Sequence, residues 1–213
     1  MAYYSDDSMK MFLEKAVKDA DFCQSVRALE FAESAHKDSP PRKMRDSDVS
    51  VPYINHPFTL ACHAFALGIA TDDLISALLL HDVCEDCGIR PEELEVSDEC
   101  REAVELVTNI RYVFEDGAWR TEKKDMDAYF SAIGGNKTAA LVKCIDRCNN
   151  VSCMALGMPK AWIEEYIAET EKYVYPLLEA VRAVPEWEGA YWLLSYQIFS
   201  HIESAKCYIK GFD

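Results

Sequence analysis

A polar segment that directly follows an apolar one places the strongest constraint on the fold of this chain. Residues 74–80 are all apolar except for one serine, and they continue without a break into His81-Asp-Val-Cys-Glu-Asp86. The first stretch has the composition of a core helix, so its end must present ionisable groups beside a buried region. A metal ion would explain this placement, because neighbouring side chains point about 100° apart on a helix and reach one ion only near its end. A solvated helix end is the alternative.

Two further segments offer ligands for the same ion. His56 lies at the predicted start of a helix, because Pro57 suits a first helical turn. Asp146 lies in the largely apolar stretch 137–156, where a charge is costly unless it is paired or metal-bound. Two imidazoles and two carboxylates suit Mn, Fe, Co, Ni or Zn better than Ca or Mg. Glu85 and Asp86 follow as a carboxylate pair that could orient water or carry a proton.

Apolar residues recur at helical spacing along most of the chain, and no alternation of period two indicates a strand. The first expected helical stretch covers about 8–36 and is broken near 19–21. The other expected helices cover about 56–67, 72–81, 97–108, 121–133, 137–156, 159–181 and 187–209. The proline-containing loop 38–52 and an irregular stretch around Gly117 interrupt the pattern. The sequence therefore predicts an all-α fold in a single domain, 1–213.

The composition argues against several classes of partner. A formal net charge of −15 disfavours nucleic-acid binding, although a divalent cation with local Arg and Lys would still allow a small anionic substrate. No apolar stretch is long enough to span a bilayer, and the first thirty residues lack the pattern of a signal peptide. Nine cysteines without an export signal favour a reducing compartment. We expect a cytoplasmic protein with neither nucleic acid nor membrane as partner; the oligomeric state stays open.

Several other residues have simpler expected roles. Cys84 with Cys87, and Cys144 with Cys148, have spacings that could imitate a zinc site, but we expect most cysteines to pack the core. His63 shares a helix face with His56, and a hydrogen-bonded core role is favoured for it. The aromatic residues in 187–196 are expected to pack the last helix or to form a subunit contact.

Three blocks in this order resemble the HD-domain metal-dependent phosphohydrolases, and within them the alarmone hydrolases of the Rel/Spo type. The blocks are Pro52-Tyr-Ile-Asn-His-Pro57, Leu79-Leu-His-Asp-Val-Cys-Glu-Asp86 and Val142-Lys-Cys-Ile-Asp-Arg-Cys-Asn-Asn150. The resemblance extends more loosely over about 25–180, so that 187–209 would be a C-terminal packing helix. It implies an all-helical bundle of the HD-domain type, working as a stand-alone small hydrolase.

The resemblance also implies an activity and a set of site residues. The activity is removal of the 3′ pyrophosphate from guanosine tetra- or pentaphosphate, giving GDP or GTP and pyrophosphate, with Mn²⁺ as the cofactor. By position, the implied metal ligands are His56, His81, Asp82 and Asp146, and the implied catalytic acids are Glu85 and Asp86. The candidate substrate-binding residues are Arg42, Lys43, Arg45, Tyr53, Lys143, Arg147 and Asn150.

Parts of this assignment stay open at the level of sequence. The segment from Lys43 to Pro52 is longer than in the family and lacks its glycine, so Arg45 competes with Arg42 as the substrate contact. Lys143 and Arg147 flank Asp146 on one helix, and we expect at most one of them to face the cleft. A buried ion pair is an equal alternative for Arg147. Two alternative functions stay open. The chain could be an HD-domain phosphatase for a nucleoside monophosphate or a dinucleotide cofactor, or it could be a non-catalytic nucleotide sensor.

Overall fold

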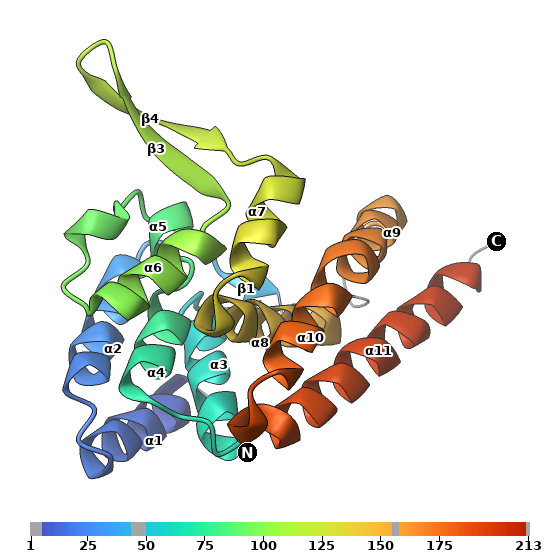
Figure 1. Cartoon of the computed structure of the whole chain (residues 1–213), viewed down its shortest axis with the longest axis horizontal. Coiled ribbons are helices and arrows are strands. Elements are labelled where there is room, and N and C mark those ends of the chain that lie inside the picture. The colour runs from blue at the N-terminus through green and yellow to red at the C-terminus, as the bar shows by residue number, and fades with distance from the viewer. Residues whose placement is uncertain (1–5, 44–49, 155–157, 212–213) are drawn as a thin grey trace.

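Helices dominate the structure, a computed structural model that describes residues 6–43, 50–154 and 158–211 (Figure 1). The α-helices are α1 (Asp6–Asp19), α2 (Cys23–Ala35), α3 (Asn55–Ala66), α4 (Asp72–Leu80), α5 (Val83–Asp86), α6 (Asp98–Val107), α7 (Met126–Gly134), α8 (Lys137–Met154), α9 (Lys160–Glu169), α10 (Tyr175–Arg182) and α11 (Glu188–Lys210). Short 3₁₀ turns η1 (Pro91–Glu93) and η3 (Pro185–Trp187) and a π-helical turn η2 (Thr170–Val174) join some of them. The predicted all-α class is confirmed.

Helix α8 is the central element of the core. It packs against α3, α4, α6 and α7 on one part of its surface and against α10 and α11 on another. Its side chains from Ala139 to Val142 and from Cys144 to Cys148 are therefore buried, which explains why most of these positions are apolar. Asp146 and Arg147 share this burial, so the fold must supply partners for both charges.

Helix α4 and the start of α2 are held together by capping. The Thr71 hydroxyl accepts a hydrogen bond from the backbone N–H of Leu74 at 3.2 Å and caps α4. The Asp72 carboxylate accepts from the backbone N–H groups of Gln24 and Ser25, at 3.0 and 2.7 Å. Asp72 thus caps α2, which has no side-chain cap from Phe22 before it. This contact joins the start of α4 to the start of α2 and sets the two helices side by side.

The expectation that the chain contains no strands is wrong. Strands β3 (Ile110–Glu115) and β4 (Ala118–Lys123) form an antiparallel hairpin that projects from the helices (Figure 1). Asp116 and Gly117 both have positive φ, 53° and 79°, and Glu115 pairs with Ala118 across them. An Asp-Gly pair is a strong signal for such a two-residue turn. The period-two pattern is absent because every residue of β4 is exposed, so neither face of the hairpin needs to be apolar.

A second pairing lies in the loop before α3. Strands β1 (Arg42–Lys43) and β2 (Ser50–Val51) are antiparallel, with Arg42 opposite Val51. This pairing closes the ends of the predicted loop and places Arg42 close to the start of α3. None of the helices in the described ranges combines the length and the hydropathy that a bilayer-spanning segment requires.

Candidate metal centre and cavity

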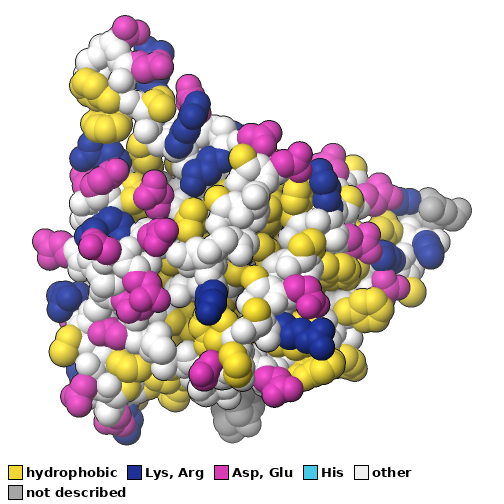
Figure 2. All heavy atoms as spheres, viewed as in Figure 1, with side chains coloured by type: hydrophobic (Ala, Val, Ile, Leu, Met, Phe, Trp, Pro, Cys, Tyr) yellow, Lys and Arg dark blue, Asp and Glu magenta, His cyan; other side chains and the backbone are white. Residues whose placement is uncertain are grey.

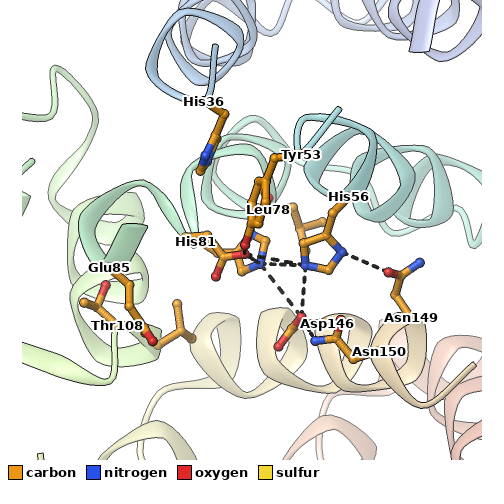
Figure 3. A network of polar contacts seen from close by, with 12 residues as sticks. His36, Tyr53, His56, Leu78, His81, Glu85, Thr108, Asp146, Asn149 and Asn150 are labelled. Carbon is orange, nitrogen blue, oxygen red and sulfur yellow. Dashed lines mark hydrogen bonds and ion pairs between the residues drawn. The ribbon is translucent and has the colours of Figure 1, made fainter. Parts of the chain in front are cut away.

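Four ionisable side chains from three separate segments meet at one point (Figure 3). His56 comes from the first turn of α3, His81 and Asp82 from the link between α4 and α5, and Asp146 from α8. The Nε2 atoms of His56 and His81 are 3.2 Å apart. Asp82 Oδ2 lies 3.0 Å from His81 Nε2, and Asp146 Oδ1 lies 3.2 Å from His56 Nε2. The structure therefore brings together all four predicted metal ligands.

The hydrogen bonds of the two imidazoles show what this arrangement can hold. His56 Nδ1 donates to the Asn149 side-chain carbonyl, and His81 Nδ1 donates to the backbone carbonyl of Leu78, both at 2.9 Å. In neutral imidazoles this leaves both Nε2 lone pairs directed at each other and at two carboxylate oxygens. Facing lone pairs repel unless a cation lies between them. The donor set therefore fits a divalent metal ion, with each imidazole oriented by its other nitrogen.

Burial and neighbouring charges set the protonation of these groups. Burial alone would raise the pKa of Asp146, but Lys143 and the two imidazoles hold that pKa well below its usual range. Burial likewise opposes ionisation of Asp82, and His81 and His56 overcome it, so the pKa of Asp82 is also lowered. Burial lowers the pKa of His56. Burial opposes a charge on His81, but Asp82 and Asp146 overcome this effect and raise its pKa, so a metal ion bound there would take the place of a proton on His81.

His56, Asp82 and Asp146 border a cavity of about 460 Å³, within the range of small-molecule sites. Its wall combines three kinds of group: carboxylates, three cations and a set of aromatic rings. The lining residues are Arg42, Tyr53, His56, Asp82, Glu85, Asp86, Asn109, Met126, Tyr129, Phe130, Lys143, Asp146, Arg147, Asn150, Trp162, Tyr166 and Glu169. His81 approaches the metal position from behind this wall. The cavity has positive side chains for an anionic ligand although the whole chain is acidic.

Comparison with known proteins agrees with this geometry. The chain is 28% identical over 166 residues to guanosine-3′,5′-bis(diphosphate) 3′-pyrophosphohydrolase MESH1 of Xenopus tropicalis, covering 76% of this chain and 87% of that protein. The human MESH1 is 28% identical over 153 residues, covering 70% and 80%, and the Drosophila melanogaster MESH1 is 24% identical over 141 residues, covering 66% and 74%. This chain is similar to the MESH1 proteins over about three quarters of its length. The resemblance predicted from the sequence blocks is thereby confirmed, although no protein-family model matches the chain.

Glu85 and Asp86 lie on the short helix α5, which directly follows His81 and Asp82 in this MESH1-like chain. The Glu85 carboxylate accepts a hydrogen bond from the backbone N–H of Asn109 at 2.9 Å, which ties α5 to the base of the hairpin. Burial raises the pKa of both carboxyl groups. Both side chains also line the cavity. Their position and their weakened acidity suit groups that accept a proton from water or return one.

Arg42 and Asn150 form a chain of hydrogen bonds to Asp146. Arg42 Nη2 donates to Asn150 Oδ1 at 2.5 Å, and Asn150 Nδ2 donates to Asp146 Oδ1 at 2.6 Å. Lys143 Nζ donates to the other oxygen, Asp146 Oδ2, at 3.1 Å. Arg45 and the side chain of Lys43 lie outside the described residues, so the choice between Arg42 and Arg45 stays a prediction. Of the two arginines, Arg42 is placed in the cavity wall.

Lys143 and Arg147 both line the cavity, whereas the sequence predicted at most one of them there. The two remain on one wall because the cavity extends along α8 toward α9 and is lined by residues of both helices. Arg147 is only 2% exposed and pairs with the carboxylate of Glu169. Its Nη1 donates to the Thr170 hydroxyl at 3.1 Å, and its guanidinium lies 3.9 Å from the centre of the Tyr166 ring. The buried ion pair, one of two alternatives from sequence, is therefore present.

Sequence reasoning missed several residues of the site. His36 stacks on Tyr53 with ring centroids 4.6 Å apart, and Asn149 orients His56. Trp162 and Tyr166 stack on each other at 4.5 Å and form an aromatic wall. The spacing of these aromatics on α9 is also that of core residues, so no local signal separates the two roles. A buried imidazole ligand does require an acceptor for its second nitrogen, but only the fold shows which residue provides it.

The cysteines whose spacing could imitate a zinc site lie mostly in the core. Cys84, Cys144 and Cys148 are free and buried, in agreement with core packing. Within the described ranges, the group whose ligand atoms lie within 4.8 Å of one another consists of His56, His81 and Asp82, so it contains no cysteine. The zinc alternative has no support here.

Tyr53 is expected to position a metal ligand. Its hydroxyl donates to Asp82 Oδ2 at 2.6 Å, and its ring lies against His36. Removing the hydroxyl in Tyr53→Phe keeps the ring stack but frees the carboxylate to rotate, and we expect Mn²⁺ affinity to fall about 10- to 100-fold. Calorimetric titration of the purified variant with Mn²⁺ measures this effect.

The matched control is Tyr173→Phe, which removes a hydroxyl that bonds to the exposed Asp127. This control is expected to bind Mn²⁺ as the wild type does. Equal Mn²⁺ affinity in Tyr53→Phe and wild type would contradict a positioning role for Tyr53.

Proposed function

We propose that this chain is a divalent-metal-dependent hydrolase that removes the 3′ pyrophosphate from guanosine 3′,5′-bis(diphosphate) or its pentaphosphate, giving GDP or GTP and pyrophosphate. The observation that carries the proposal is the convergence of His56, His81, Asp82 and Asp146 at the wall of a cavity that also contains cations. The similarity to MESH1 proteins, whose names state this activity, supports the choice of substrate.

In this proposal the four convergent side chains hold the metal, and Mn²⁺ is the preferred ion. The two imidazole nitrogens and two carboxylate oxygens match the mixed ligand set of such ions. A divalent cation bound there would make water a stronger nucleophile and would neutralise charge on the phosphate oxygens. Asn149 and Leu78 keep the imidazoles turned toward the ion through their Nδ1 hydrogen bonds.

The remaining site residues either transfer protons or bind the substrate. Glu85 and Asp86 take up a proton from the attacking water and supply one to the departing group, which their burial-raised pKa values favour. Arg42, Lys143 and Asn150 contact the phosphates or the nucleoside from the wall next to Asp146. Lys43, Arg45, Tyr53 and Arg147 complete the proposed substrate-binding set. Water adds to the phosphorus that is bonded to the 3′ oxygen of the ribose, the bond between this phosphorus and the 3′ oxygen breaks, and the 3′ oxygen takes up a proton. The products are therefore GDP or GTP with a free 3′ hydroxyl, and pyrophosphate.

We further propose that residues 1–213 form one HD-type domain that works in the cytoplasm without nucleic acid or membrane as partner. The packing of α8 against helices from both halves of the chain supports one shared core. The net charge of −15 disfavours nucleic acid and anionic lipid surfaces.

A substrate panel tests the proposed activity. Purified protein is incubated with guanosine tetraphosphate, a nucleoside monophosphate or a dinucleotide cofactor, each with Mn²⁺ and with excess chelator. We expect GDP and pyrophosphate from the first substrate, only with the metal. Phosphate release from one of the other two, with the tetraphosphate intact, would replace the proposed substrate. Binding of the tetraphosphate without product at any metal tested would indicate a sensor, for which Asp82→Ala serves as the inactive reference.

A further inference from the structure

Helix α11 has two apolar faces, and the rest of the described chain buries only one of them. The first face packs on α8, α9 and α10 through Ala190, Leu194, Ile198, Ile202, Ala205 and Ile209, all of them buried. The second face carries Trp192, Leu193, Tyr196 and Phe199, which are 60%, 44%, 71% and 56% exposed. The outward face of a helix in a globular protein is normally polar. The second face of α11 is therefore a candidate contact surface.

The four exposed side chains form one patch. Positions 192, 196 and 199 follow the three- and four-residue spacing of a helix stripe, and 193 lies beside them. In the space-filling view, hydrophobic side chains gather on the surface along α10 and α11, at the lower right (Figure 2). Tryptophan and tyrosine are enriched in the residues that contribute most to protein interfaces. A contiguous patch of this kind marks an interaction site more often than scattered apolar residues do.

The charge distribution indicates which partner fits this surface. Helix α11 contains two acids, Glu188 and Glu203, and two lysines, Lys206 and Lys210, so its net charge is zero. The whole chain carries −15, so the rest of the molecule holds the entire excess of negative charge. Two copies of this chain repel each other over most of their surfaces and can approach with the least repulsion along α11.

The order of these charges also suits self-association. Glu188 begins the helix and Lys210 ends it, whereas Lys206 is already paired with Glu171 and Glu203 of its own chain. Antiparallel pairing of two α11 helices sets Glu188 of each toward the end of the other that carries Lys210, and it also opposes the two helix dipoles favourably. Such a pair has two-fold symmetry, so every contact occurs twice.

We propose that a second copy of this chain covers the exposed face of α11, with the two helices antiparallel and the two-fold axis between Tyr196 and Phe199. A stable interface buries about 800 Å² on each partner, and aromatic side chains bury about 150–250 Å² each. Three aromatics and a leucine therefore supply a large part of the required area. The helix, at about 34 Å, is long enough for a pair of this size.

The oligomeric state of the full chain tests this proposal. Sedimentation or light scattering over a concentration series is expected to give twice the chain mass of 24.2 kDa for the wild type. Tyr196→Glu and Phe199→Glu each add two facing negative charges to a symmetric contact, and both are expected to give the monomer mass. Phe114→Glu is the matched control, since Phe114 is 60% exposed on the hairpin, and this variant is expected to stay dimeric. Circular dichroism confirms that each variant folds.

Cysteine cross-linking tests the orientation of the pair. In the antiparallel arrangement two copies of Tyr196→Cys lie near the axis and cross-link under mild oxidation. The exposed Cys207 lies about ten residues from the axis, so its two copies are about 30 Å apart and are expected not to cross-link. A Cys207–Cys207 cross-link identified by mass spectrometry overturns the antiparallel geometry. Three results would overturn the proposal as a whole. They are a wild type that is monomeric at every concentration, loss of the dimer only in Phe114→Glu, and flotation of a monomer with anionic vesicles.

Discussion

Replacing Asp146 with asparagine is expected to remove nearly all hydrolysis and to weaken Mn²⁺ binding by more than about 100-fold. Loss of a residue that only orients a metal ligand lowers metal affinity about 10- to 100-fold. Asp146 is expected to have a larger effect because it belongs to the donor set itself, 3.2 Å from His56 Nε2. The neutral amide keeps the size of the side chain but loses the charge that faces Lys143. Calorimetric Mn²⁺ titration and kcat/KM for guanosine tetraphosphate measure the two effects.

The matched control for Asp146→Asn is Asp98→Asn. Asp98 is an exposed carboxylate that pairs with Arg101 on the surface of α6, so both the metal affinity and kcat/KM are expected to stay at the wild-type level. A folded Asp146→Asn protein that binds Mn²⁺ as tightly as the wild type would falsify the assignment of the four-residue centre. Lost hydrolysis with retained metal binding would restrict Asp146 to a role in substrate binding.

Arg147→Ala is expected to lower the free energy of unfolding by about 3 kcal/mol, because it leaves the partners of a buried cation without their contact and opens a cavity. The guanidinium is 2% exposed and contacts Glu169, Thr170 and the Tyr166 ring together. The Glu169 side chain is 31% exposed and recovers some hydration, which keeps the expected loss at the lower end for a broken buried pair. Urea unfolding followed by circular dichroism measures this loss.

Two further variants give this prediction its controls. Arg182→Ala removes an exposed arginine that pairs with Glu179, and we expect a change within about 0.5 kcal/mol. Arg147→Met keeps most of the volume and separates packing from charge. If Arg147→Ala unfolds as the wild type does and instead raises KM for the tetraphosphate at least tenfold, the arginine acts on the substrate and the ion pair is incidental.

Arg147 obtains two partners from the junction of α9 and the π-helical turn η2, where Glu169 and Thr170 keep regular helical φ and ψ angles. Glu169 ends α9 and Thr170 begins η2, so the two are adjacent in sequence and would point about 100° apart on a regular helix. Both nevertheless reach the same guanidinium. Single π turns inside helices are often found at functional sites. The same helix carries Tyr166 against the guanidinium face, so this part of the cavity wall is built around Arg147.

Much of the candidate site could be predicted from the sequence because burying a charge is costly. His81 and Asp82 directly after an apolar helix, and Asp146 inside an apolar one, each need a partner that local structure does not provide. Pro57 similarly places His56 in a first helical turn, and the structure confirms this position. The all-helical class follows from apolar spacing in the same way, because a long helix packed on one side has to repeat its apolar residues.

The hairpin of β3 and β4 could not be predicted from the cost of burial. All of β4 is exposed and β3 is only partly buried, without alternation, so burial leaves no period of two in their sequence; only Asp116-Gly117 indicates the turn. The stack of His36 on Tyr53 and the bond from His56 to Asn149 are likewise invisible in the sequence. Each joins residues from separate segments, and neither partner has a pattern of its own.

The sequence by itself determined which residues are too polar for their apolar surroundings, and so it named the four candidate ligands and the helical class. Only the tertiary structure decided that Asp82 and Asp146 each place an oxygen within 4 Å of both imidazole Nε2 atoms. It also decided that Lys143 and Arg147 share the cavity with Arg42, and that α11 keeps an exposed aromatic face. The reason is physical: the cost of burial acts on each residue where it stands, whereas convergence depends on how helices far apart in the chain pack together.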